Sequence, residues 1–132
     1  MVWGALASVG MSMVIGFLCY SPFSLGKYWM RANYPGQTYS QVKEGFSPAI
    51  MPLVLCSSSI LVAVLHYFVG PYLGVTSVPA ALKVGLALSV VNMLVNFPHL
   101  LYNRSSVVAY LIDHSYNAAV VTASCLCLVY FS

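Results

Sequence analysis

The sequence predicts an all-α integral membrane bundle of about four transmembrane helices with short loops. Of its 132 residues, 61% are hydrophobic and only 5% are charged, whereas a soluble domain carries about 25% charged residues. The apolar residues fall into four long stretches, and each is long enough for a bilayer-spanning helix, which needs about 20 residues. Several proline and glycine residues and most of the charged residues lie between these stretches. We therefore expect a single transmembrane domain that covers residues 1–132.

The first span is expected over about 2–20, an apolar run without a charged residue. No Lys or Arg precedes it, so it lacks the charged start of a secretory signal and is expected to remain as a helix. Small residues occur in it at every fourth position, at Gly4, Ser8, Ser12 and Gly16. This spacing forms a smooth face that another helix can approach closely. The sequence leaves open whether that helix belongs to this chain or to a partner.

The other three spans are expected over about 48–69, 79–102 and 107–131. Pro48 follows Ser47 at the start of the second span, and Pro79 starts the third, which are positions where proline is well tolerated in a helix. Tyr and Trp residues lie near several of the predicted span ends, as is typical of the membrane interface.

Basic residues are concentrated on one side of the predicted bundle. The connectors after the first and third spans share a side and carry Lys27, Arg31, Lys43 and Arg104, whereas only Lys83 lies towards the other. By the positive-inside rule, the basic side faces the cytoplasm or the mitochondrial matrix, and both termini face the opposite side. We expect membrane lipids around the helices, with an anionic lipid headgroup at the basic side. We favour a mitochondrial inner membrane or a bacterial plasma membrane.

The third and fourth spans each carry a polar stripe. Asn92, Asn96 and His99 share one face of the third span, and Asp113 and Asn117 share one face of the fourth. Amides and carboxylates are costly against lipid. We therefore expect the two stripes to face each other as a polar seam.

Asp113 is the most informative single residue of this seam, and it has two interpretations. As a structural group it would be tied to Arg104, Lys27 or His99. As a functional group it would bind a cation or relay protons together with a histidine. His66, near the end of the second span, is interpreted as an interfacial histidine.

Known catalytic signatures are absent from the sequence, and we expect no enzymatic activity of the chain's own. The four cysteines lack zinc-type spacing, so neither a metal site nor a cofactor is expected. A nucleic-acid partner is not expected, because no basic run is long enough to follow phosphates.

Residues 19–30 read C-Y-S-P-F-S-L-G-K-Y-W-M, which resembles the signature W-Y-S-P-x-x-F-G-K-x-W-M of a family of small four-helix membrane proteins. That family is catalogued as a domain of unknown function (number seventeen sixty-one). Cys19 stands here in place of the tryptophan and Leu25 in place of the phenylalanine. Residues 110–116, Y-L-I-D-H-S-Y, are similar to the family's Y-L-I-D-x-x-Y element, which follows an arginine. The resemblance implies four spans and no assigned activity, and marks as special the positions Pro22, Gly26, Lys27, Trp29, Arg104 and Asp113.

Two functions are consistent with these features. The first is a structural or accessory subunit of a larger membrane complex, such as an energy-transducing, respiratory-type assembly. Its partners would be other membrane subunits, reached through helix contacts. The alternative is an oligomeric carrier of a small solute or ion, in which the seam of Asp113 and His99 would line the path.

Overall fold

The computed structural model describes residues 2–131, and it confirms the all-α fold class. α1 (Val2–Tyr20) is followed by two short helices, α2 (Gly26–Asn33) and α3 (Tyr39–Glu44). The next long helix is continuous and comprises α4 (Ile50–Val64), the π-helical turn η1 (Leu65–Val69) and α5 (Gly70–Tyr72). The chain then forms a hairpin of α6 (Val78–Tyr102) and α7 (Val107–Tyr130).

Three of these helices are long and apolar enough to cross a membrane, which identifies an integral membrane protein. They are α1, the continuous helix Ile50–Tyr72, and α6. α7 is a fourth long helix, and its first half carries Asp113, His114 and Asn117. These polar residues lower its hydropathy, and all three are half-buried.

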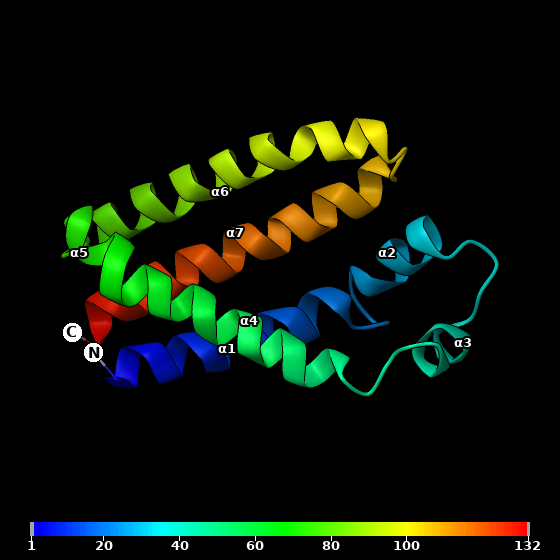
Figure 1. Cartoon of the computed structure of the whole chain (residues 1–132), viewed down its shortest axis with the longest axis horizontal. Helices are drawn as coiled ribbons and strands as arrows, with labels where there is room; N and C mark the ends of the chain where they lie inside the picture. The colour runs from blue at the N-terminus through cyan, green and yellow to red at the C-terminus, as the bar shows by residue number, and fades with distance from the viewer. Residues whose placement is uncertain (1, 132) are drawn as a thin grey trace.

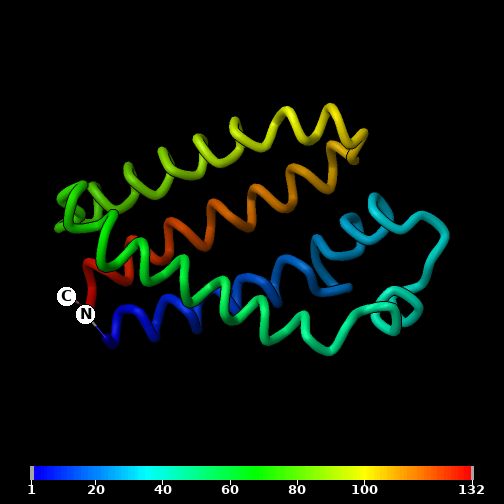
Figure 2. Tube along the Cα trace, viewed as in Figure 1, coloured from blue at the N-terminus to red at the C-terminus, as the bar shows by residue number. Residues whose placement is uncertain are grey.

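α7 occupies the centre of the bundle (Figure 1). It packs along α6 on one side and along α1 on the other, while α4 packs against α1 and η1 reaches α7. The trace in Figure 2 shows α6 and α7 as an antiparallel hairpin, and shows the segment with α3 extending beyond the ends of the long helices. A Cβ added at Gly4 would lie 3.3 Å from Phe131 Cβ. The start of α1 and the end of α7 therefore lie at the same end of the bundle.

The small-residue face of α1 is filled by the chain itself, which settles the question that the sequence left open. Gly4, Ser8 and Ser12 are buried, and a Cβ at Gly4 would approach the Cys127 carbonyl oxygen to 3.1 Å. At Gly16 the neighbour is the ring of Tyr116, 3.5 Å from the Cβ position. α7 is therefore the helix that this face accommodates.

The contact between α6 and α7 is closest at Gly85. A Cβ at this position would lie 2.7 Å from Thr122 Cα and 2.8 Å from Thr122 Oγ1. Since the first of these atoms is backbone, no rotation of a side chain could relieve the contact. A residue without a side chain is what allows the two backbones to come this close.

The connector between α1 and α4 is helical where the sequence predicted only a polar loop. α3 begins with a capping box: Thr38 Oγ1 accepts from the Gln41 amide, and Gln41 Oε1 accepts from the Thr38 amide. α2 begins at Gly26 and packs against α7 and the end of α1. The position of α2 matters because it brings Trp29 to the bundle.

We expect Gly85→Ala to lower the free energy of unfolding by about 1 to 3 kcal/mol, because the added methyl group would push α6 away from the backbone of α7. Gly10→Ala on α1 is the matched control, since nothing lies within 4 Å of its Cβ position and alanine favours a helix. Thermal unfolding of both purified variants in the same detergent measures the difference. Equal midpoints would contradict the close approach of α6 and α7.

Candidate functional site

The Asp113 carboxylate joins three helices near the start of α7. Its Oδ1 accepts a hydrogen bond from the Tyr20 hydroxyl at 2.5 Å and another from the Trp29 indole Nε1 at 2.9 Å. Tyr20 is the last residue of α1, and Trp29 lies in α2. Hydrogen bonds to an ionised acceptor are about twice as strong as those between neutral groups. The two donors therefore stabilise a half-buried carboxylate and attach α1 and α2 to α7.

Aromatic rings fix the orientation of these two donors. Tyr20 meets the Trp29 ring edge to face, with 5.5 Å between centroids, and meets the Tyr116 ring at 5.3 Å. Trp29 also contacts the Tyr34 ring at 5.9 Å. Edge-to-face pairs of this kind add stability beyond the burial of their surface. The hydroxyl and the indole N–H are thus held towards Asp113 by their neighbours.

Gly26 makes the turn between α1 and α2 possible. A Cβ here would lie 2.2 Å from the Tyr20 carbonyl oxygen and 2.5 Å from that of Ser21, distances that real Cβ atoms do not adopt. Any other residue would force α2 away from the end of α1. Gly26 therefore sets the position from which Trp29 reaches Asp113.

The other positions of the interfacial motif lie outside this contact. Pro22, Lys27 and Arg104 are exposed, and the Lys27 ammonium lies over the Tyr28 ring, 5.0 Å from its centroid. The expected tie of Asp113 to a charged residue or to His99 is thus replaced by neutral donors. The sequence-based prediction considered ionisable partners alone and overlooked Tyr20 and Trp29.

A polar pocket of about 180 Å³ opens beside Asp113, between α2, α6 and α7. It brings together three of the predicted seam residues, Asn96, His99 and Asp113, and adds His114 and Tyr110 from α7. The remaining polar lining comes from Asn33, Asn103 and Ser105. Part of the predicted seam therefore forms one wall of an open pocket.

The remaining two seam residues lie beside this pocket. Asn92 is half-buried and accepts from the Asn96 amide. Asn117 is also half-buried and lies one turn of α7 beyond Asp113, outside the pocket's lining as the described residues define it.

His66 forms a second polar site, towards the other end of the bundle. Its side chain is only 1% exposed, so the expectation of an interfacial histidine is wrong. The ring enters the space beside the small residues of α1: its Nε2 lies 3.0 Å from Ser8 Oγ and 3.2 Å from the Ser124 carbonyl oxygen. The Ser8 hydroxyl already donates to the Gly4 carbonyl at 2.8 Å. Both neighbours can therefore only accept, and Nε2 carries the proton.

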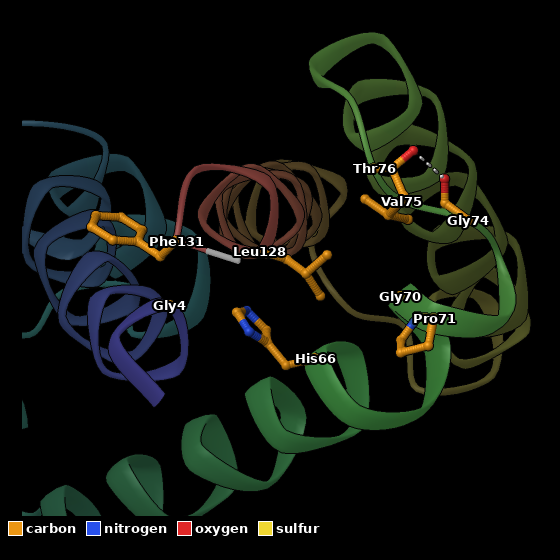
Figure 3. Close-up of a pocket in the computed structure, with 9 residues that line it drawn as sticks. All are labelled: Gly4, His66, Gly70, Pro71, Gly74, Val75, Thr76, Leu128 and Phe131. Atoms are coloured by element: carbon orange, nitrogen blue, oxygen red, sulfur yellow. Dashed lines mark hydrogen bonds between the residues drawn. The ribbon is translucent and has the colours of Figure 1, made fainter. Parts of the chain in front are cut away.

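The π-helical turn Leu65–Val69 carries His66, and turns of this type are frequent at functional sites. Figure 3 shows the imidazole lying between the helix that bears Gly4 and the end of α7. His66 also lines a pocket of about 220 Å³ with Gly70, Pro71, Val75 and Leu128. Within residues 2–131, no three His, Cys, Asp or Glu side chains are placed so that together they could hold a metal ion.

The family model described as "Protein of unknown function (DUF1761)" matches residues 3–129, and the chain therefore belongs to this family. The two segments that resemble its signature meet in the structure, where Trp29 of the first donates to Asp113 of the second. No curated protein and no solved structure matches the chain.

Trp29→Phe should destabilise the protein by about 1 to 2 kcal/mol, because it removes a hydrogen bond to a carboxylate while keeping an aromatic ring. Trp3→Phe is the matched control, as Trp3 is 74% exposed, and it should be nearly neutral. Thermal unfolding in detergent gives both values. In an Asp113→Ala background, Trp29→Phe should cost much less stability, because the hydrogen bond is already lost. An equally large loss of stability in that background would contradict the Trp29–Asp113 bond.

Ser8→Ala should cost about 1 kcal/mol more than Ser12→Ala. Both serines are buried and both donate to their own helix, but only Ser8 also accepts from the buried His66 ring. The proton resonances of the His66 ring, followed by NMR in detergent micelles, should shift in Ser8→Ala and not in Ser12→Ala. Equal stabilities and unshifted resonances would exclude the assigned hydrogen bond.

Proposed function

We propose that this DUF1761 member acts as a structural or accessory subunit of a larger membrane complex. The observation that carries the proposal is the attachment of α6, which packs mainly against α7. Only 11% of the most apolar stretch of α6 is buried. A helix that is covered along one side only leaves most of its surface available to another helix.

Uncovered apolar surface lies on α4 and α6 and also on α1, where Trp3 and Phe17 are each 74% exposed. Residues 50–57 at the start of α4 are all exposed. On α6 the exposed side chains include large apolar residues along its whole length, namely Leu82, Leu86, Val90, Val91, Leu94, Val95 and Leu101. Because α7 packs on the small-residue face of α1, a partner subunit would pack on the large exposed side chains of these helices instead. Close packing would hold such a partner, since lipid is as apolar as these side chains.

The proposal places the basic end of the bundle at the cytoplasmic or matrix side, with the described ends of the chain on the opposite side. Lys27, Arg31, Lys43 and Arg104 are exposed, as contact with an anionic lipid headgroup would require. An energy-transducing membrane, mitochondrial inner or bacterial plasma, fits a small subunit of this kind.

A carrier of a small solute or ion is the second candidate. The polar pocket at Asp113 and His99 favours it, since an intramembrane carboxylate beside an open pocket is suited to bind a cation. A route through the membrane would need a second copy of the chain to enclose it.

Native electrophoresis of membranes solubilised in mild detergent tests the proposal. We expect the chain to migrate in a hetero-oligomeric complex and Val90→Trp, on the uncovered side of α6, to release it without changing its thermal midpoint in detergent. Tyr72→Trp, at an 89% exposed position on α5, is the control and should remain assembled. Migration of the unaltered chain as a homodimer would overturn the subunit and favour the carrier.

A further inference from the structure

Two of the three amide side chains that line the Asp113 pocket, Asn96 and Asn33, donate hydrogen bonds within their own helices. Asn96 Nδ2 donates to the Asn92 main-chain oxygen at 2.8 Å and to its Oδ1 at 2.9 Å. Asn33 Nδ2 donates to the Trp29 carbonyl oxygen at 3.1 Å. Both N–H donors of Asn96 and one of the two of Asn33 are thus used, and each of these amides keeps its side-chain carbonyl oxygen as an acceptor for a ligand.

Tyr110 and His114 add acceptors of the same kind. The Tyr110 hydroxyl donates to the Met93 carbonyl oxygen, which leaves its oxygen lone pairs. The His114 ring packs on Tyr110 at 4.2 Å between centroids. Its Nδ1 is buried and has no hydrogen-bond partner within the described chain, and in the tautomer protonated at Nε2 this atom is a further acceptor.

The pocket also carries one negative charge. Both donors to Asp113 end on Oδ1, so Oδ2 is the oxygen left for a ligand. Asn103 and Ser105 belong to the described lining of the pocket, whereas Arg104 between them does not. The carboxylate thus lies in an acceptor-rich pocket into which no Lys or Arg of the described chain extends.

A cationic ligand with several hydrogen-bond donors would complement the carboxylate and these acceptors. A primary ammonium group has three N–H donors and no acceptor, as a lysine side chain does. Leu100 and Ala109 line the same pocket and would contact the carbon chain of such a molecule. A volume of about 180 Å³ accommodates a small organic amine rather than only a bare ion.

We propose that the pocket between α2, α6 and α7 binds a protonated primary amine, with the ammonium group on Asp113 and Asn96. The amine would belong either to a free small molecule or to the ethanolamine headgroup of a lipid, since the pocket lies near the α6–α7 turn, at an end of the bundle. The inference rests on the same pocket as the carrier candidate, but it requires binding alone. A chain that fails to transport the amine would leave it standing.

Trp29 is a built-in reporter for this binding, because its indole donates to the same carboxylate. The chain has two tryptophans, so Trp3→Phe leaves Trp29 as the single emitter. Titration of this variant in detergent with ethylamine hydrochloride, at neutral pH and constant ionic strength, should give a saturable change in emission. Tetramethylammonium chloride has the charge without N–H donors and should give none, and sodium chloride should give none.

Asp113→Asn in the same background should weaken ethylamine binding by about tenfold or more, because it removes the charge. It keeps an oxygen that can accept from Tyr20 and Trp29. Asn96→Leu leaves Asp113 and both its donors in place and should weaken binding by about threefold or more, because a carbonyl acceptor is lost. If Asp113→Asn does not fold, the affinity of Asn96→Leu for ethylamine tests the proposal.

Nanodiscs distinguish the two sources of the amine. If the ligand is a lipid, phosphatidylethanolamine should alter Trp29 emission relative to phosphatidylcholine and should reduce the response to free ethylamine. If it is a free molecule, ethylamine should act equally in both lipids. Equal responses to ethylamine, tetramethylammonium and sodium, or unchanged affinity in both variants, would overturn the proposal.

Discussion

One end of the bundle depends on the hydrogen bonds that Asp113 accepts from Tyr20 and Trp29. The main contacts of the short helix α2 are with α7 and the end of α1. Its position is fixed by the turn at Gly26 and by the Trp29 indole. A carboxylate in an apolar surrounding is unfavourable unless it is hydrogen-bonded. The two hydrogen bonds that satisfy this carboxylate therefore hold the end of α1 and α2 against the same side of α7.

The second constraint is the close approach of the α1 and α6 backbones to α7. It also explains the burial of the His66 ring. Small residues on α1 and Gly85 on α6 let both helices contact α7 closely. The space that Gly4 and Ser8 leave on α1 is also what admits the imidazole of His66 into the core. Many hydroxyl groups along the long helices donate to carbonyl groups of their own helix, as Ser89 does to Gly85. These groups then need no partner in the lipid, where an unsatisfied polar group is costly.

The sequence predicted the features that depend on local pattern. The apolar runs correspond to long helices, the four-residue spacing on α1 to a close-packed face, and the amides of α6 to a side that is half-buried next to α7. It could not predict partners far apart in the chain: Tyr20 lies 93 residues from Asp113, and neutral donors have no charge signal that would reveal them. It also missed the burial of His66, because a π-helical turn has no recognisable pattern and because the ring fits only against the small residues of another helix. The motif shared with the family already contained Tyr20 and Trp29, and was the one signal that could have identified them.

The central place of α7 has a consequence for biosynthesis. α1 is made first and α7 last among the helices of the described chain, so the smooth face of α1 has no occupant while the intervening helices enter the bilayer. The innermost contacts of the described chain therefore form only after α7 has been made. Until then, α1 presents to the membrane a surface on which any passing helix with small side chains can pack. Insertion of α7 is therefore the step that brings the earlier helices of the described chain together.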